Sequence, residues 1–251
     1  MKYIMKYIMK HYWINIDRCV DRRAYMESQF EEKSIDNYRI SAETPATIAD
    51  YDIIRNEGSI ETTTPEEISC ILSHLKAIEQ GYDDGDAYFC VLEDDLELAK
   101  IDFGKMQKYI EDFQNKNNAV IDILQLFTNG HPPVIQLYNE HFLKNEVIVK
   151  RHEAYPSTAY YLISREGARK ILDKYVLSEN KYDLSYSSWT AADNIIYAAA
   201  DAYVLTYPIA VSDITFGSII HPVHLQNHEY CNNIIRHIWN VNNQLKMFEP
   251  S

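Results

Sequence analysis

The chain has 251 residues, of which 46% are hydrophobic and 24% are charged, and its formal net charge is −13. This negative charge argues against nucleic acid as a main partner, because binding a phosphate backbone requires a basic face. No stretch is long and apolar enough for a membrane span, and lysines interrupt the apolar positions of the first ten residues, unlike a signal-peptide core. The composition therefore predicts a single globular domain over residues 1–251, without a targeting signal.

The four cysteines are scattered and form no C-x-x-C pair. Cys70 and Cys90 fall on segments that are expected to be buried. This usage suits a cytoplasmic or otherwise reducing compartment.

The first part of the chain predicts a strand, a helix and a second strand. Residues 12–17 are aromatic and β-branched and become polar at Asp17, which is typical of a strand. A helix over 21–32, with Asp21 as its N-cap, and a short strand over 37–40 follow. Residues 41–63 show no period and predict a surface loop.

The next helix has a strong start signal. Thr64 is a capping residue, Pro65 occupies the first helical position and Glu67 stands three residues after the cap. Apolar residues then recur at helical spacing until Gly81, which is predicted to end the helix. A short apolar run over 87–92 predicts a buried strand.

The remaining chain continues the alternation of strands and helices. Strands are expected over 121–127, 147–149, 159–163 and 202–206, and helices over 106–113, 165–176 with Ser164 as cap, 191–200 and 229–245. Such alternation predicts an α/β fold with a mostly parallel central sheet and helices on both faces.

Three consecutive acids, Glu93, Asp94 and Asp95, follow the predicted strand over 87–92. Open α/β sheets bind ligands at the carboxyl ends of their strands, and adjacent carboxylates repel one another unless cations or protons neutralise them. In an extended chain Glu93 and Asp95 point to the same side, where they can hold a hard divalent cation. The alternative is a solvated acidic turn, which the apolar strand before it disfavours.

A cation held by so few protein ligands indicates a phosphate-bearing substrate. Neither a G-x-G-x-x-G loop nor a P-loop is present, which argues against a dinucleotide-dependent dehydrogenase and a P-loop NTPase. Arg18, Arg22 and Arg23 could contact phosphates, or they could simply form a basic first helical turn on the surface. Ser73 and His74 are adjacent on a helix and point about 100° apart, so they make a poor nucleophile–base pair.

Four ordered blocks of sequence carry a family resemblance. They are WINIDR with DRR from Trp13 to Arg23, EISCILSH from Glu67 to His74, VLEDD from Val91 to Asp95, and AYYLISREGA from Ala159 to Ala168. With their spacing, these blocks resemble glycosyltransferase family 25 over roughly residues 11–215. That family includes lipopolysaccharide galactosyltransferases and collagen galactosyl- and glucosyltransferases.

The resemblance implies a GT-A-like nucleotide-sugar fold. The LEDD acids would take the DxD role, with Glu93 and Asp95 binding Mn²⁺ that bridges the phosphates of a UDP-sugar, and with Asp94 assisting. Asn15 and Asp17 would lie near the nucleotide, while Ser73 and His74 would face the donor site.

Two further sets of residues are candidates under this resemblance. Asp193 would act as the base that takes the proton of the acceptor hydroxyl, although an acid at a helix N-terminus is also stabilised by the helix dipole alone. His221 and His224 are candidate metal ligands, with His228 nearby, although HPVHLQNH is equally consistent with a polar surface segment and departs from the bacterial family pattern.

The resulting hypothesis is a Mn²⁺-dependent hexosyltransferase that uses UDP-galactose or UDP-glucose. The acceptor is either a glycan or a hydroxylysine of a collagen-like protein, and the oligomeric state is left open. The rival functions are a metal-dependent phosphohydrolase and a non-catalytic nucleotide-sugar-binding module of the same fold.

Overall fold

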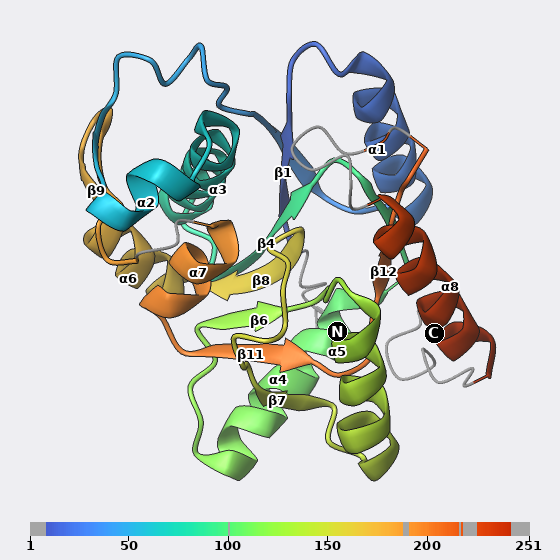
Figure 1. Cartoon of the computed structure of the whole chain (residues 1–251). Coiled ribbons are helices and arrows are strands. Elements are labelled where there is room, and N and C mark those ends of the chain that lie inside the picture. Colours follow the sequence, from blue (N-terminus) through green and yellow to red (C-terminus); the bar gives the residue numbers. More distant parts are fainter. Residues whose placement is uncertain (1–8, 100, 188–190, 216, 218–224, 242–251) are drawn as a thin grey trace, which may run out of the picture.

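The computed structural model describes residues 9–99, 101–187, 191–215, 217 and 225–241 (Figure 1). His221 and His224 lie outside the described residues. The predicted terminal helix is described as α8, Leu225–Val241.

A seven-stranded sheet forms the centre of the molecule, in the order β2-β1-β4-β8-β6-β11-β7. The strands are β1 (His11–Asn15), β2 (Asn37–Ser41), β4 (Tyr88–Glu93), β6 (Ile123–Gln125), β7 (Ile148–Lys150), β8 (Tyr160–Ser164) and β11 (Ala202–Leu205). The pairs β1–β2, β1–β4 and β6–β11 are parallel, whereas β8 and β7 run antiparallel to their neighbours. Five of the seven strands therefore share one direction, which confirms the mostly parallel α/β fold and is consistent with a GT-A-like architecture.

Alternation along the central strands produces a core on each face of the sheet. In β1, Tyr12 packs on one face and Trp13 on the other; in β4, Val91 and Leu92 divide in the same way. Successive side chains of a strand point to opposite faces, so a strand covered on both sides must be apolar throughout. This requirement explains the unbroken apolar runs of β4 and β8.

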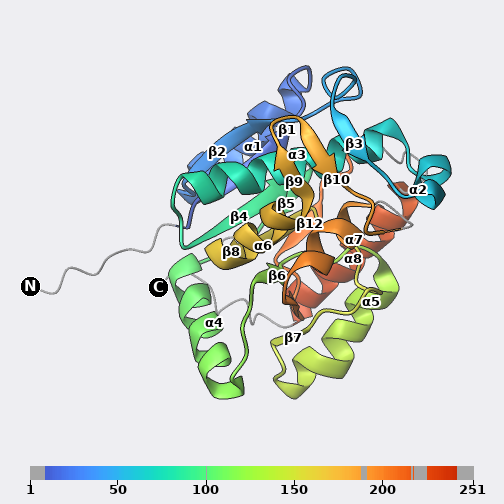
Figure 2. The same cartoon turned by 90° about the vertical axis from the view of Figure 1, so that its left-hand side faces the viewer.

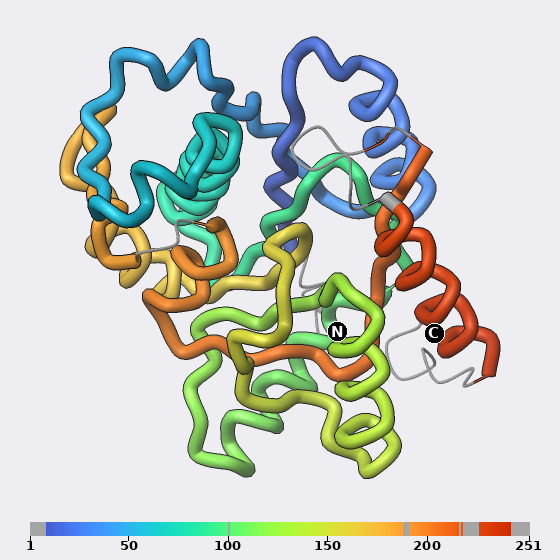
Figure 3. Tube along the Cα trace, viewed as in Figure 1, coloured from blue at the N-terminus to red at the C-terminus, as the bar shows by residue number. Residues whose placement is uncertain are grey.

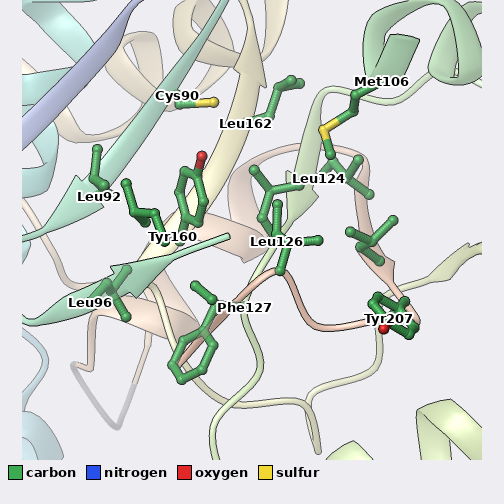
Figure 4. Close-up of a cluster of buried hydrophobic side chains, with 14 of the residues drawn as sticks. Cys90, Leu92, Leu96, Met106, Leu124, Leu126, Phe127, Tyr160, Leu162 and Tyr207 are labelled. Atoms are coloured by element: carbon green, nitrogen blue, oxygen red, sulfur yellow. The ribbon is translucent and has the colours of Figure 1, made fainter. Parts of the chain in front are cut away.

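Helices cover both faces (Figures 1 and 2). One face packs against α3 (Pro65–Asp83), α6 (Arg165–Tyr175) and α7 (Ala192–Ile196). The other packs against α1 (Val20–Lys33), α4 (Phe103–Asn117), α5 (His131–Gln136) and α8. Figure 4 shows part of the second core, where Tyr160 and Leu162 of β8 lie among Leu124 of β6 and Met106 of α4. Among the helices that the structure describes, none is both long and apolar enough to cross a membrane.

Helix α3 begins as predicted but ends later. Thr64 and Glu67 form a reciprocal capping box with Pro65 in the first turn. The helix continues past Gly81 to Asp83, so Gly81 is not its terminator. Instead, a Cβ at Gly81 would lie 2.5 Å from the Phe89 ring, which shows that the glycine allows α3 to approach β4 closely.

The sequence predicts a surface loop over 41–63, but the structure has regular elements in this region. It contains β3 (Asp52–Ile54) and α2 (Glu57–Thr62), which is capped by Asn56. Strand β3 pairs with β10 (Lys181–Asp183), which in turn pairs with β9 (Val176–Ser178). A three-residue strand whose partner lies about 130 residues away has no local period to reveal it.

Several other element boundaries differ from the sequence prediction. Helix α1 begins at Val20 after Cys19, so Asp21 lies in the first turn and is not the N-cap.

Strands β5 (Leu96–Leu98) and β12 (Ala210–Ser212) pair with each other and were not predicted. Helix α5 was also not predicted; it continues into the short helical turns Leu137–His141 and Phe142–Lys144. Helix α7 is shorter than the expected 191–200 and continues as a turn of 3-10 helix, Tyr197–Ala199. Figure 3 shows the course of the chain through these elements, coloured from the N-terminus to the C-terminus.

Candidate active site

A cavity of about 700 Å³ opens at the carboxyl ends of β1, β4 and β6. These three strands run in the same direction, so their ends reach the same edge of the sheet. Five segments supply much of its lining: 42–46, the α3 positions between Glu66 and His74, Glu93 to Asp95, 156–159 and 191–193. All three LEDD acids therefore lie where a ligand of an open α/β sheet binds.

Asp94 lies on the cavity wall, but both of its carboxylate oxygens accept hydrogen bonds from protein side chains. Its Oδ1 accepts a hydrogen bond from Arg22 Nη1 at 2.7 Å, and its Oδ2 accepts one from Asn15 Nδ2 at 2.6 Å. Both side chains of the Arg22–Asp94 ion pair are less than 10% exposed. Asp94 thus fixes the turn after β4 to the end of β1 and to α1.

The predicted nucleotide residues near β1 separate into two groups. Arg18 lines the cavity and is exposed, whereas Asn15 and Asp17 do not line it. Asn15 is buried and reaches the cavity only through Asp94, while its Oδ1 accepts from Arg39 Nε at 3.0 Å. Asp17 is exposed and pairs with Arg39, whose hydrogen bond lowers the pKa of the Asp17 carboxyl.

Glu93 and Asp95 have a different environment from Asp94. Both line the cavity, and their side chains are 30% and 26% exposed. Burial and the neighbouring Glu93 carboxylate raise the pKa of Asp95 to about 7, even though Arg22 Nη1 lies 3.7 Å from Asp95 Oδ2. Two carboxylates that repel each other at the rim of a cavity form an oxygen donor set that suits a hard divalent cation.

Ser73 and His74 both line the cavity but make separate contacts. Ser73 Oγ donates to the Ser69 carbonyl at 2.7 Å and accepts from the Glu43 amide at 2.8 Å, so it ties α3 to the 42–46 segment. The His74 ring is fully buried; its Nδ1 lies 3.2 Å from the Tyr161 hydroxyl and its Nε2 lies 3.4 Å from Glu93 Oε1. These contacts separate the two side chains, as expected for residues that do not act as a nucleophile–base pair.

Cys70 also lines the cavity, although its sequence context predicted only burial. It lies one helical turn before His74, and the ligand atoms of Cys70, His74 and Glu93 are within 4.8 Å of one another. The i, i+4 spacing of Cys70 and His74 puts them on one face of a helix. The sequence does not show that this face contacts the end of β4, where Glu93 lies.

Asp193 is placed on the cavity wall by α7. Its Oδ2 accepts a hydrogen bond from the Ser157 amide at 2.7 Å, and the Tyr197 hydroxyl donates to the Ser157 carbonyl at 2.9 Å. Ser157 has a φ of 101°, which is unusual for a residue with a side chain. Asp193 therefore helps to hold a strained segment of the cavity wall.

The candidate histidines near the C-terminus are only partly described. His228 lies on α8, lines the cavity and is within 3.0 Å of Asn129 Nδ2. Helix α8 thus brings a late part of the chain to the site.

Comparison with known proteins gives a family for this arrangement. Residues 8–186 match the model of glycosyltransferase family 25, described as lipopolysaccharide (LPS) biosynthesis protein, which covers the LEDD acids but ends before Asp193. The chain is also 24% identical over 174 residues to the lacto-N-neotetraose biosynthesis glycosyltransferase LgtE of Neisseria gonorrhoeae. That alignment covers 67% of this chain and 61% of the relative. Because the family match spans more than half of the sequence, the chain belongs to glycosyltransferase family 25.

Proposed function

We propose that the chain transfers galactose or glucose from a UDP-sugar to a hydroxyl of a glycan, with Mn²⁺ as cofactor. The observation that carries this proposal is the pair Glu93 and Asp95, which faces the cavity at the carboxyl ends of the parallel strands. A glycan is the favoured acceptor because the family description and the name of the LgtE relative both refer to glycan biosynthesis.

The donor set fits the cation. Glu93 and Asp95 offer carboxylate oxygens, and the pKa of Asp95 is raised first by its burial and then by repulsion from Glu93. A divalent cation would relieve both effects. Bound Mn²⁺ would supply Lewis-acid stabilisation of the charge on the departing diphosphate. Asp94 would support the pair indirectly, since its oxygens are held by Arg22 and Asn15.

The cationic side chain best placed for donor phosphates is Arg18. It is exposed on the cavity wall, whereas Arg22 is buried against Asp94 and Arg23 bonds to the Asp17 carbonyl. A guanidinium donates two parallel hydrogen bonds to phosphate oxygens and needs no glycine-rich loop. Arg18 would therefore orient the diphosphate beside the acids.

Asp193 is proposed as the base for the acceptor hydroxyl. Its Oδ2 accepts a hydrogen bond from the Ser157 amide, which fixes the carboxylate on the cavity wall. A carboxylate positioned in this way accepts the hydroxyl proton as the oxygen attacks the sugar.

Two substitutions distinguish a catalytic base at Asp193 from a residue that only stabilises the cavity wall. Asp193→Asn keeps an oxygen that can accept from Ser157 but removes the basic carboxylate, and Asp193→Ala removes both. If Asp193 is the base, Asp193→Asn lowers kcat by about 10²–10⁴-fold while thermal stability is retained. Near-normal turnover in Asp193→Asn, with loss only in Asp193→Ala, would contradict this role.

The function itself is tested by UDP release. Metal-stripped protein is assayed with UDP-galactose and UDP-glucose, with and without Mn²⁺, against an oligosaccharide acceptor and a hydroxylysine peptide. We expect Mn²⁺-dependent release that requires the oligosaccharide. Release that ignores the acceptor would indicate a hydrolase, and a preference for the hydroxylysine peptide would overturn the glycan assignment.

A further inference from the structure

Cys70, His74 and Glu93 form a mixed sulfur, nitrogen and oxygen cluster at one side of the cavity. Cys70 and His74 come from consecutive turns of α3, and Glu93 is the last residue of β4. Their three ligand atoms lie within 4.8 Å of one another, and all three residues line the cavity.

The His74 ring carries a buried nitrogen that no group in the described part of the chain satisfies. The side chain has no exposed surface, and Nε2 has no hydrogen-bond partner among the described residues, although Glu93 Oε1 lies 3.4 Å away. Buried polar atoms are nearly always paired, so an orphan nitrogen beside a carboxylate indicates a missing partner. The Tyr161 hydroxyl at Nδ1 is placed to hold the ring and its tautomer, as second-shell groups do for metal-bound histidines.

The spacing of the cluster is close to that of a zinc site. Zinc bond lengths and tetrahedral angles put neighbouring ligand atoms about 3.3–3.6 Å apart. The separation between His74 Nε2 and Glu93 Oε1, 3.4 Å, already lies in this range. The remaining separations, at most 4.8 Å, require shifts of only about 1 Å, which side-chain rotations supply.

We infer that Cys70, His74 and Glu93 bind Zn²⁺, with the fourth coordination position open to the cavity. Thiolate and imidazole favour Zn²⁺, whereas Mn²⁺ favours oxygen ligands. Three protein ligands with a fourth position for water or a ligand are the pattern of open zinc sites, in contrast to closed structural ones. On binding, the Cys70 thiol loses its proton to solvent through the cavity and the thiolate sulfur joins the metal.

This inference rests on the proposed function in one respect, because Glu93 is shared with the proposed Mn²⁺ pair. Zn²⁺ at the cluster takes Glu93 away from Asp95, so zinc competes with the donor cation. The site thereby makes sugar transfer sensitive to zinc through Cys70, which lines the cavity but is not one of the proposed ligands of the donor cation or phosphates.

Cobalt substitution tests the cluster directly. Metal-stripped full-length protein is titrated with Co²⁺, which takes zinc sites and gives a near-ultraviolet charge-transfer band only when a thiolate is bound. We expect this band in the wild type and its loss on addition of Zn²⁺. We expect it to be absent in Cys70→Ser and kept in Cys19→Ser, a matched control because Cys19 is also half-buried but does not line the cavity.

Two results would overturn the zinc site: absence of the band in the wild type, or its persistence in folded Cys70→Ser, with folding checked by circular dichroism. The measurement needs no nucleotide sugar, so it is independent of the proposed function. A band in protein that transfers no sugar would uphold the zinc site while contradicting the proposed function. Mn²⁺-dependent transfer without a band would do the reverse.

Discussion

Strand β4 has an acidic run at each end, and the two runs differ in their surroundings. Before the strand, Asp84 pairs with Lys10, and the Tyr12 hydroxyl lies 2.7 Å from carboxylate oxygens of both Asp84 and Asp86. After the strand, Arg22 and Asn15 bind Asp94, whereas Glu93 and Asp95 face the cavity.

The pKa values move in opposite directions at the two ends. Hydrogen bonds from Lys10 and Tyr12 lower the pKa of Asp84 to about 2, whereas burial and Glu93 raise the pKa of Asp95 to about 7. Both runs contain three acids within four residues. In this chain the acidic run that indicates a site is the one that leaves two carboxylates, Glu93 and Asp95, facing the cavity.

Of the changes at the two ends of β4, Asp95→Asn should have the largest effect, a loss of activity. Removing one carboxylate of the cavity pair should reduce kcat/KM by roughly 10²–10³-fold, the range seen when a preorganised electrostatic group is lost. Stability should be kept, because the substitution relieves repulsion with Glu93. The measurements are steady-state UDP release and urea unfolding.

A matched control for that variant is Glu97→Gln. Glu97 lies two residues further along, carries the same charge, pairs with Arg236 and does not line the cavity. Its activity should stay close to that of the wild type. Equal losses in the two variants would show that the cavity acids have no special role.

The second effect concerns stability at the same end of the strand. Asp94→Ala leaves the buried Arg22 guanidinium with only the more distant Asp95 carboxylate, which should cost about 3 kcal/mol of unfolding free energy. Urea denaturation measures this loss. Adding Arg22→Met should recover part of it, because the uncompensated charge is then removed; an unchanged unfolding midpoint in Asp94→Ala would refute the structural role of Asp94.

The smallest effect is expected at the start of the strand. The pKa of Asp84 is lowered in the folded state, so its ionised form adds stability above the unfolded pKa of 3.8, and that stability is lost as the pH falls toward about 2. Asp84 is 27% exposed, so Asp84→Asn should cost only about 1 kcal/mol at pH 7. Urea unfolding at several pH values should show the gap between wild type and variant closing between about pH 4 and pH 2; a gap independent of pH would contradict the assignment.

Much of the fold follows from local signals in the sequence. The buried strands β1, β4 and β8 are apolar runs, and α3 and α6 begin at side-chain caps that the structure confirms at Thr64 and Ser164. Elements that depend on distant partners were missed. Strands β3, β5, β10 and β12 have three residues each, and tertiary pairing defines them more than any period.

The candidate site could be predicted only in part for the same reason. The sequence predicts three acids at the end of a buried strand. It does not show that Arg22, 72 residues away, forms an ion pair with Asp94. Nor could it show that Cys70 and His74 face Glu93, or that Asp193 holds Ser157. Such roles depend on which segments the sheet brings to one edge.

The central claim is that the end of β4 where Glu93 and Asp95 face the cavity binds the donor cation. Binding of Mn²⁺ in the presence of UDP is measured by the paramagnetic resonance signal of the free ion. The wild type and Asp84→Asn/Asp86→Asn should bind Mn²⁺ alike, and Glu93→Gln/Asp95→Asn should bind it at least about tenfold more weakly. Equal affinity in all three proteins, or weakening in the Asp84/Asp86 variant alone, would contradict the claim.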